Sequence, residues 1–239
     1  MRFVHKRFKS AYHITMLREP LSRAISEFYE RIYGTPPGVT HPCSSDLPPQ
    51  LKAAAMEGDK EPSVDRLGQV MYDKLFPHWL RCSNNMAANR QTRILSLARD
   101  STDEAHLRQR HCNDSPGLRL AGLDSGNCSL TIARWTLMQF TYFGLSEERC
   151  LSERLFTAQF GLDFSDDLGL QVGAKAGKGA HKFKNLAYDE LRLDDQQQLI
   201  DINRLDIELY KTAHAVFFKR IAEYNISRSG CTFLKSGAW

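Results

Sequence analysis

The side chains best suited to chemistry lie near the N-terminus, in the stretch AYHITMLREPLSRAISEFYERI at positions 11–32. Arg18 follows a short run of β-favouring residues, and Ser22 and Ser26 are four residues apart, so both would face one side of a helix. A guanidinium gives paired, charge-assisted hydrogen bonds and a hydroxyl adds another, which suits a phosphate group. The residues alone leave an alternative open, in which the arginine pairs with a nearby acid and the serine faces solvent.

These side chains need a strand, a sharp turn and a helix to position them. Tyr12–Leu17 is predicted to be a buried strand, and Pro20 fits the first helical position because its N–H would be unpaired there. Gly34 is expected to end the helix. The helix has an apolar stripe of Leu21, Ala24, Ile25, Phe28 and Ile32, with Ser22, Arg23, Ser26, Glu27 and Glu30 elsewhere on its surface. Arg18 would then lie at the carboxyl end of a strand, where ligands bind in open α/β sheets.

The segment LREPLSRAISEF at 17–28 resembles the 3′-phosphate-binding segment of carbohydrate sulfotransferases, which take sulfate from PAPS (3′-phosphoadenylyl sulfate). It is most similar to the heparan sulfate 6-O-sulfotransferases, in which a strand runs into an LRDPVSRYLSEW-like helix. In that family the arginine and the later serine hold the 3′-phosphate, so the resemblance assigns this role to Arg18 and Ser26. Glu19 stands where the family has Asp, and Phe28 where it has Trp.

Three later segments resemble the same family in the same order. NNMAANRQTRILSL at 84–97 is similar to its LANNRQVRML stretch, and INRLDIELYKTAHAVFFKR at 202–220 to its closing NDLDMQLY helix. FTYFGLSEERCLSERLFTAQFGLDF at 140–164 resembles its FFGL strand with the helix and short strand that follow. The resemblance implies an α/β fold of the P-loop-containing nucleotide hydrolase-like sulfotransferase type, incomplete here, helix-rich and with a small parallel sheet. We expect one partial domain over 1–239, with a loop-rich excursion at about 35–62.

A second candidate site is the glycine- and lysine-rich segment GLQVGAKAGKGAHKFK at 169–184. Its glycines allow a ligand to approach the backbone, and its lysines supply positive charge; the alternative is a solvated loop. It is not a Walker A loop, because the glycine spacing is one residue short. In the sulfotransferases a YNSTRAG-like loop at this place closes over the nucleotide. The resemblance puts its Arg-Ala pair on Lys175 and Ala176 and its aromatic on Gln171, where lysine lacks the bidentate fork of arginine.

Two parts of the family pattern have no counterpart in this sequence. The family cradles the 5′-phosphosulfate with a KTGG(T/S)-like loop, but no glycine precedes Gly34. It also has a histidine base upstream of the 3′-phosphate segment, and His5 and His13 lie too close to the predicted strand to match it. The chain therefore resembles the C-terminal two-thirds of such a domain, as a fragment, a mis-started gene model or a degenerate homologue. Its catalytic residues are left unassigned.

The other predicted elements follow from periodicity and end signals. The region 64–80 is expected to be helical and broken near Pro77, 98–127 to be polar and loop-like, and 130–138 to be a helix. The polar region carries His106, His111 and Cys112, whose spacing matches no common metal site, so we expect no metal.

The C-terminal half is predicted to contain one more strand and two helical regions. A strand at 141–145 should lead into a helix that Ser146 caps, with Glu147 and Glu148 in its first turn, and that Gly161 closes. A long helical region should span about 194–224. The predicted core positions of these two helical regions are Leu151, Leu155, Phe156, Leu209, Ala213, Val216, Phe217 and Ile221.

Composition sets only loose limits on function. The net charge of +4 permits a polyanionic partner, while DNA binding would call for a stronger basic face, so no nucleic-acid partner is expected. No apolar run approaches the ~20 residues of a membrane span, and the first residues lack the apolar core of a signal peptide. The resemblance implies a glycoprotein of the Golgi lumen, associated with the membrane, whose anchor, if any, lies outside this chain.

Cysteines and glycosylation sequons bear on the compartment. The 6 cysteines form no CxxC pair, and disulfides and free thiols both remain open at this point. Sequons at Asn113, Asn127 and Asn225 favour a lumenal protein only weakly, because Asn-X-Ser arises by chance.

The resemblance implies transfer of a sulfuryl group from PAPS to a hydroxyl of a glycan such as heparan sulfate, a polyanionic glycosaminoglycan. Arg18 would offset charge on the 3′-phosphate, Ser26 would position it, and Lys175 would cover the nucleotide. Two alternatives remain: a non-catalytic remnant that binds PAP, the desulfated nucleotide, or a glycan, and a helical interaction module with no nucleotide site.

Overall fold

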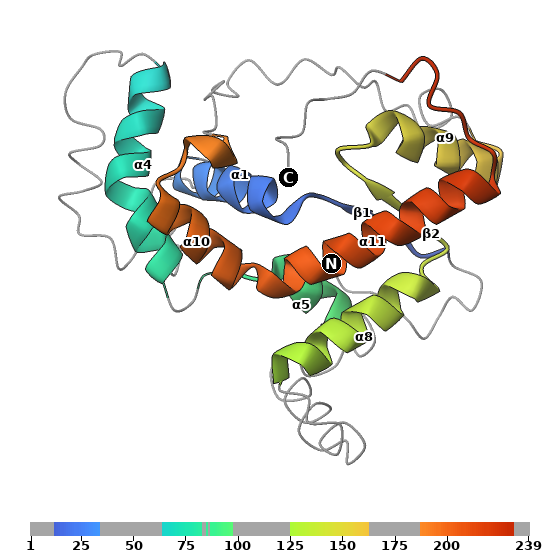
Figure 1. The fold of residues 1–239 in the computed structure, drawn as a ribbon, viewed down its shortest axis with the longest axis horizontal. Coiled ribbons are helices and arrows are strands. Elements are labelled where there is room, and N and C mark those ends of the chain that lie inside the picture. Colours follow the sequence, from blue (N-terminus) through green and yellow to red (C-terminus); the bar gives the residue numbers. More distant parts are fainter. Residues whose placement is uncertain are drawn as a thin grey trace. The chain divides into compact units, whose positions relative to one another are not determined.

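The computed structural model describes residues 12–33, 64–82, 85, 87–97, 125–162 and 187–231. The chain divides into two compact units, whose elements are labelled in Figure 1. Unit 1 comprises Met1–Glu19, Asn89–Leu170 and Arg204–Ser236, and unit 2 comprises Pro20–Ala88, Gln171–Asn203 and Gly237–Trp239. The prediction of a single domain stays a prediction, and the expected excursion at about 35–62 lies outside the described residues.

The sheet of unit 1 is small and parallel, as predicted. β1 (Ile14–Leu17) pairs with β2 (Tyr142–Leu145), with Ile14 opposite Tyr142 and Leu17 opposite Leu145. All four residues of β2 are buried. The prediction of a buried strand was wrong for most of β1, since Ile14 is 46% and Met16 45% exposed. Ile14 and Met16 are two residues apart, so their side chains point to the same face of the sheet, and that face is incompletely covered over β1.

Helices surround this sheet in unit 1. They are α5 (Arg90–Leu97), α8 (Ser125–Gln139), α9 (Arg149–Phe160) and α11 (Arg204–Glu223). α9 packs on β2, and α8 packs on both α5 and α11. The predicted helix at 130–138 is confirmed and begins earlier, so the last residues of the predicted polar loop are helical. Residues 98–124, with His106, His111 and Cys112, lie outside the described residues.

The predicted core of unit 1 is confirmed. Leu151, Leu155 and Phe156 on α9 are buried, and so are four of the five core positions predicted for α11, whereas Val216 is partly buried against them. They pack with the buried side chains of β2 and α8, such as Phe143 and Leu137. These apolar faces hold α9 and α11 against the sheet.

One end of α9 follows the prediction and the other does not. Gly161 ends the helix in the left-handed region at φ 68° and donates its N–H to the Thr157 carbonyl. The N-cap residue is Glu148, and Ser146 is not the cap. Ser146 instead donates its backbone N–H to the Leu17 carbonyl at 2.8 Å, so it extends the pairing of β2 with β1. The pairing of the strands, rather than the capping propensity of serine, therefore determines the role of Ser146.

Unit 2 is built from α1 (Pro20–Tyr33), α4 (Val64–Arg81), the short 3₁₀ helix η1 (Tyr188–Glu190) and α10 (Leu193–Ile202). α1 begins at Pro20, and the four described positions of its predicted apolar stripe, Leu21, Ala24, Ile25 and Phe28, are buried. Phe28 meets Phe76 and Trp79 of α4 edge-on, with ring centroids 4.9 Å and 5.4 Å away. Aromatic packing thus joins α1 to α4.

α4 continues through Pro77, so the predicted break there was wrong. Proline lacks an N–H and ordinarily disrupts a helix interior. Phe76 and Trp79 flank this position, are 1% and 3% exposed, and lie 5.6 Å apart in a stacked arrangement. Burial of these rings holds the last turn in helical form despite the missing hydrogen bond.

The helical region predicted at about 194–224 consists of two helices separated at Asn203. Asn203 is fully buried, and its Nδ2 donates to the Leu199 carbonyl at 3.0 Å, which closes the end of α10. α10 belongs to unit 2 and α11 to unit 1. None of the described helices combines the length and apolar character that crossing a membrane requires.

Gly144 tests the close contact between β2 and α9. A Cβ at this position would come within 2.6 Å of Met16 Sδ and 2.9 Å of Ser152 Cβ. We therefore expect Gly144→Ala to lower the free energy of unfolding by about 1–3 kcal/mol, the usual cost of overpacking a core. Chemical denaturation followed by circular dichroism measures this change.

Gly161→Asn is the matched control for Gly144→Ala. Among the described residues, no atom lies within 4 Å of a Cβ built on Gly161, and asparagine tolerates its left-handed backbone. We expect this variant to stay within about 0.5 kcal/mol of the wild type. Equal losses in the two variants would contradict the packing argument.

Candidate functional site

Arg18 lies at the carboxyl end of β1 in unit 1, as predicted. Its side chain is exposed, and among the described residues no hydrogen bond or ion pair involves its guanidinium. Its main chain is held at two points, because Arg18 N–H donates to Gln91 Oε1 at 2.9 Å and Gln91 Nε2 donates to the Arg18 carbonyl at 2.8 Å. The backbone of Arg18 is thus fixed while its charged end is available to a ligand.

Gln91 is itself held by the N-terminus of α5. Asp206 Oδ2 accepts the Gln91 N–H at 3.0 Å, and its Oδ1 accepts the Thr92 N–H at 2.6 Å. Asp206 is fully buried and lies in the first turn of α11. A carboxylate from one helix therefore caps the start of another, satisfying two N–H groups that have no partner within α5.

The capping is reciprocal. Asn89, just before α5, accepts the N–H groups of Leu205 and Asp206 on its Oδ1 at 2.8 Å and 3.2 Å. Asn89 has φ 46°, in the left-handed region that asparagine enters more readily than most residues. The starts of α5 and α11 are locked together, and Gln91 lies within this lock.

A second carboxylate closes the same edge of the sheet. Glu147 follows β2, and its Oε1 accepts the Glu19 N–H at 2.9 Å while its Oε2 accepts the Tyr210 hydroxyl at 2.8 Å. Burial, and then the negative charges of Glu147, Glu19 and Glu148, raise the pKa of Tyr210 well above its ordinary value. Tyr210 is therefore a neutral donor that anchors Glu147 to α11.

Ser26, the predicted partner of Arg18, lies half-buried on α1 in unit 2. Within the described part of the chain its hydroxyl has no hydrogen-bond partner. Arg18 and Ser26 belong to different units, so their joint contact with a phosphate stays a prediction. Gln171, Lys175 and Ala176, the predicted nucleotide-loop residues, lie outside the described residues.

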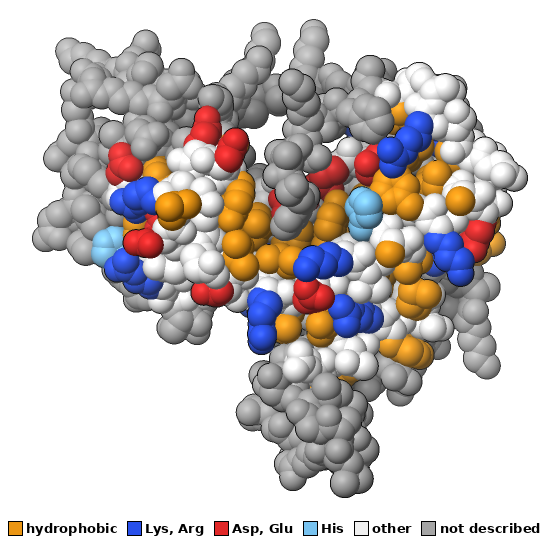
Figure 2. Space-filling model, viewed as in Figure 1, with side chains coloured by type: hydrophobic (Ala, Val, Ile, Leu, Met, Phe, Trp, Pro, Cys, Tyr) orange, Lys and Arg blue, Asp and Glu red, His pale blue; other side chains and the backbone are white. Residues whose placement is uncertain are grey.

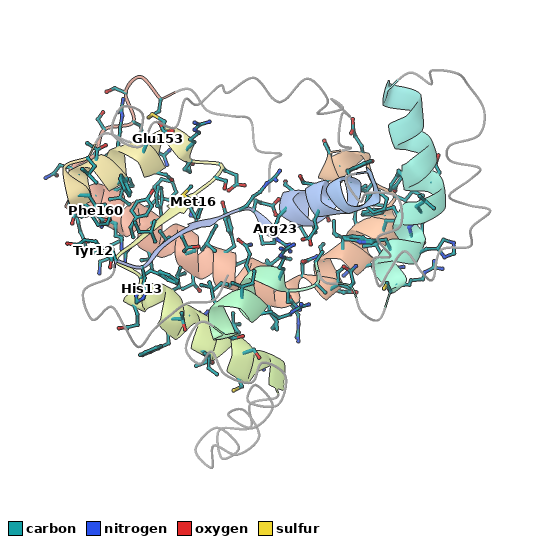
Figure 3. All side chains as sticks on the ribbon, turned by 180° about the vertical axis from the view of Figure 1, so that it is seen from behind. Tyr12, His13, Met16, Arg23, Glu153 and Phe160 are labelled. Carbon is teal, nitrogen blue, oxygen red and sulfur yellow. A yellow bond between two sulfur atoms is a disulfide. The ribbon has the colours of Figure 1, made fainter. Side chains whose placement is uncertain are left out.

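The polar face of α1 differs from a solvated face. Arg23 Nη1 contacts Glu27 Oε2 at 2.9 Å, with side chains only 12% and 7% exposed. Arg23 Nη2 also donates to the Ala87 carbonyl at 2.8 Å and to Asn203 Oδ1 at 3.0 Å. Arg23 is labelled in Figure 3. Arg23 is thus a structural centre of unit 2, and the spacing of four between opposite charges was the signal for its pair with Glu27.

His13 packs as an aromatic side chain. Its ring meets Phe140 edge-on at 5.9 Å between centroids, next to the Tyr12–Phe160 contact at 5.3 Å (Figure 3). The described residues contain no group of three or more His, Cys, Asp or Glu side chains that could hold a metal ion. Neither observation adds a catalytic group to the edge of the sheet.

Surface charges on unit 1 are partly paired. Glu208 of α11 contacts Lys211 at 2.9 Å and Arg134 at 3.5 Å, and Lys219 lies 3.8 Å from Glu223. On the face shown in Figure 2, basic and acidic side chains are interspersed among hydrophobic and uncharged ones. Such exposed pairs contribute little to stability, and this face carries mixed charge.

The cysteines resolve the alternative that the sequence left open. Cys150 and Cys231 form a disulfide with each other. Cys82 and Cys128 are each part of a disulfide as well. Every cysteine in the described part of the chain is therefore oxidised. Structural disulfides are typical of proteins that fold in an oxidising compartment.

In the described part of the chain, the sheet edge offers the Arg18 guanidinium as an available cation on a fixed main chain, beside carboxylates that are already hydrogen-bonded. Such an edge can bind an anionic group through Arg18. The sequence pointed to Arg18 but not to Gln91 or Asp206, and it placed Glu147 in the first turn of α9 rather than at the site, whereas α9 begins at Arg149. The signal was present, because Asn89 and Gln91 fall in the matched segment 84–97, and Asp206 in the matched segment 202–220.

Comparison with known proteins finds heparan-sulfate 6-O-sulfotransferases. The chain is 28% identical over 217 residues to heparan-sulfate 6-O-sulfotransferase 3-B of Danio rerio, a match that covers 90% of this chain and 44% of the relative. It is 26% identical over 218 residues to human heparan-sulfate 6-O-sulfotransferase 3, a match that covers 90% of this chain and 40% of the relative. It is 27% identical over 214 residues to human heparan-sulfate 6-O-sulfotransferase 1, a match that covers 87% of this chain and 44% of the relative. No protein-family model matches the chain.

These comparisons confirm the resemblance seen in the motifs as a distant relationship. The chain is related to the heparan-sulfate 6-O-sulfotransferases at 26–28% identity over about nine-tenths of its length. It spans less than half the length of these curated relatives, from 40% to 44% in the three named.

Asp206 tests the lock between α5 and α11. We expect Asp206→Ala to lower the free energy of unfolding by about 2 kcal/mol or more, since loss of a cap costs about 1 kcal/mol and buried N–H groups are left unpaired. Asp206→Asn, which keeps one acceptor oxygen, should lose less. Urea denaturation provides the measurement.

Asp201→Ala is the control for the Asp206 variants. Asp201 is an exposed acid that accepts a hydrogen bond from Gln197 one turn away. It should change stability by no more than about 0.5 kcal/mol. If Asp206→Ala were equally mild, the reciprocal capping would not be holding the two helices together.

Proposed function

We propose that this chain contains the donor-binding part of a PAPS-dependent carbohydrate sulfotransferase, similar to the heparan sulfate 6-O-sulfotransferases. The reaction is transfer of a sulfuryl group to a glycan hydroxyl. The observation that carries the proposal is the Arg18 guanidinium, exposed at the carboxyl end of β1, on a main chain held by Gln91. The distant relationship to the 6-O-sulfotransferases supports it.

Arg18 is proposed to bind the 3′-phosphate of the donor. A guanidinium forms bidentate, charge-assisted hydrogen bonds with phosphate, and it stays charged at any physiological pH. A main chain fixed at both its N–H and its carbonyl reduces the conformational freedom lost when the ligand binds. The same contact would persist in the product PAP.

The chemistry follows from the donor. An acceptor hydroxyl oxygen forms a bond to sulfur as the bond from sulfur to the 5′-phosphate oxygen breaks, and PAP leaves with the electron pair. A base takes the hydroxyl proton, and cationic groups stabilise the charge that develops on the leaving group. Arg18 contributes at the nucleotide end; the base is not assigned to a residue of this chain.

The remaining donor contacts are proposed from the resemblance alone. Ser26 would position the 3′-phosphate, and Gln171, Lys175 and Ala176 would lie along the nucleotide. The finer fold assignment, a P-loop-containing nucleotide hydrolase-like sulfotransferase fold, belongs to the same proposal. Variants at Ser26 and Lys175 test these roles separately from that of Arg18.

The cellular setting is proposed to be the secretory pathway, with the Golgi lumen as the place of action. Disulfide-bonded Cys82, Cys128, Cys150 and Cys231 support an oxidising compartment. The proposed acceptor is a polyanionic glycan, as the names of the relatives indicate for those proteins. A net charge of +4 is compatible with such a partner.

A second candidate function is nucleotide binding without transfer. It has its own support, since Arg18 is exposed on a main chain that Gln91 holds, while Glu147 and Tyr210 are hydrogen-bonded to each other. This candidate predicts PAP binding and no movement of sulfate. An assay with radiolabelled PAPS and desulfated heparin separates the two, because labelled heparin forms only in the first case.

Arg18→Ala tests donor binding. Calorimetric titration with PAP should give a dissociation constant that rises about tenfold to a hundredfold in the variant, because a charged hydrogen bond is worth about 1.5–3 kcal/mol. Arg149→Ala is the matched control, since Arg149 is an exposed arginine of the same unit that pairs with Glu153 at 2.8 Å. It should bind PAP as the wild type does. A wild-type protein that does not bind PAP would sink both nucleotide-binding functions.

Gln91→Met tests whether the clamp positions Arg18. Methionine has a similar size but makes neither hydrogen bond, so PAP binding should weaken several-fold. A positioning residue acts through its partner, and the same change made in Arg18→Ala protein should have no further effect on binding. Titration of the four proteins of this double-mutant cycle measures the coupling.

Gln197→Met is the control for the clamp, because Gln197 is exposed and, among the described residues, its side chain hydrogen-bonds only Asp201. Its PAP affinity should equal that of the wild type. Additive losses in the Gln91 and Arg18 variants would mean that Gln91 acts on the fold rather than on Arg18.

A further inference from the structure

The turn after α11 carries a glycosylation sequon that the proposed function does not use. Asn225-Ile226-Ser227 follows the helix directly, and Asn225 is exposed. Its φ of 53° lies in the left-handed region, and the Ile226 N–H returns to the Ile221 carbonyl at 3.0 Å. This is the usual geometry of a helix C-terminus, in which asparagine is one of the residues that occupy the left-handed position.

The residues of this sequon differ in exposure. None of the described residues hydrogen-bonds the Asn225 carboxamide, and Ser227 is exposed as well. Ile226 packs against the core of unit 1, so the turn is anchored through its middle residue. A bulky, hydrophilic substituent on Asn225 would therefore extend into solvent without disturbing a packed side chain.

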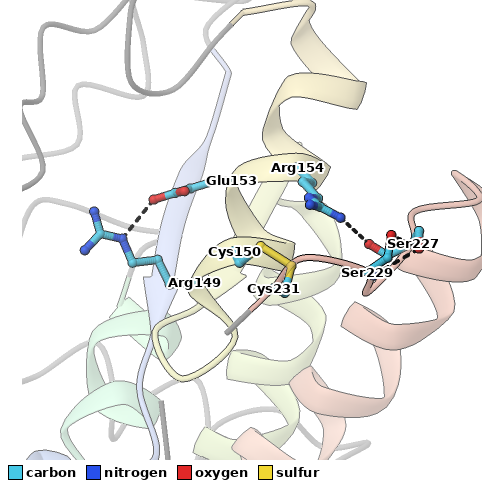
Figure 4. Close-up of a disulfide and its surroundings, with 7 residues drawn as sticks. All are labelled: Arg149, Cys150, Glu153, Arg154, Ser227, Ser229 and Cys231. Carbon is cyan, nitrogen blue, oxygen red and sulfur yellow. Dashed lines mark hydrogen bonds and ion pairs between the residues drawn. A yellow bond between two sulfur atoms is a disulfide. The ribbon is translucent and has the colours of Figure 1, made fainter. Parts of the chain in front are cut away.

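The segment beyond the sequon is tied down by covalent and polar contacts. Cys231 forms its disulfide with Cys150 of α9, and Arg154 of the same helix donates to the Ser227 carbonyl (Figure 4). These contacts place the turn on a formed surface of unit 1. The disulfide also indicates the oxidising compartment in which N-linked oligosaccharides are attached.

A second described sequon, at Asn127, lies in a different environment. Asn127 falls within α8, and its carbonyl accepts the Thr131 hydroxyl at 2.9 Å. The middle residue of the sequon, Cys128, is fully buried and disulfide-bonded. A large substituent on Asn127 would be attached to a helix that packs into the core of unit 1. The structure therefore favours Asn225 over Asn127 as a site for such a substituent.

We infer that Asn225 is a site of N-linked glycosylation. The carboxamide nitrogen of Asn225 forms a bond to the anomeric carbon of an oligosaccharide carried on a polyprenyl pyrophosphate. The bond from that carbon to the pyrophosphate oxygen breaks, the lipid pyrophosphate leaves with the electron pair, and the nitrogen loses one proton to a base. The Ser227 hydroxyl completes the recognised sequence.

The test uses the whole chain, directed into the secretory pathway of eukaryotic cells by a cleavable signal sequence. The purified protein is treated with peptide N-glycosidase in ¹⁸O-labelled water, which converts a glycosylated asparagine to labelled aspartate. Peptide mass spectrometry should find the label at position 225. An unlabelled Asn225 in the wild-type protein overturns the inference, whatever the other sequons carry.

Variants confirm the assignment independently. Asn225→Gln and Ser227→Ala should each lower the apparent mass on a denaturing gel by one glycan. Ser227→Thr should keep the apparent mass of the wild type. Asn127→Gln is the control and should leave the glycan at Asn225 in place. A glycan at Asn225 that survives Ser227→Ala would contradict recognition through this sequon, and Ser227→Ala avoids any strain at the left-handed position.

Discussion

The arrangement of unit 1 depends on the exchange of caps between two helices. Asn89 caps the start of α11, and Asp206 caps the start of α5, so neither helix can begin where it does without the other. Gln91 then reaches the main chain of Arg18 at the end of β1. The cation proposed to bind the donor is thereby positioned by hydrogen bonds to its own backbone N–H and carbonyl.

The two arginines near the start of the chain show why burial decides the role of a charge. Arg18 is exposed, and the described residues offer its guanidinium no partner. Arg23 is nearly buried and bonds to Glu27, Ala87 and Asn203. Removing one partner from a buried pair leaves a desolvated charge, so Arg23 must stay paired and cannot serve a ligand as well. Both look alike in the sequence, five residues apart, and only the tertiary contacts distinguish them.

Local signals predicted the parts of the fold that short-range physics controls. Pro20 begins α1, Gly161 ends α9, and β2 lies one residue inside its predicted range, because backbone geometry and apolar periodicity act within a few residues. Where the sequence prediction was wrong, contacts with residues far away in the sequence determine the structure. Ser146 pairs with β1 rather than capping a helix, and the rings around Pro77 are held by burial against Phe28. The site follows the same rule, since Arg18 could be named from its motif, whereas Gln91 and Asp206 gain their roles only through contacts across 73 and 115 residues.

The parallel pairing of β1 with β2 imposes an order on folding. The Glu19–Glu147 hydrogen bond joins residues 128 positions apart, and the two strands pair over a similar separation. Closing so long a loop costs conformational entropy before the strand contacts contribute any favourable free energy. Chains dominated by contacts between distant residues therefore fold slowly. During synthesis β1 leaves the ribosome long before β2 exists, so its apolar residues wait without their partner and are open to wrong associations. The arginine at its end cannot acquire its final setting until more than half of the chain has been made.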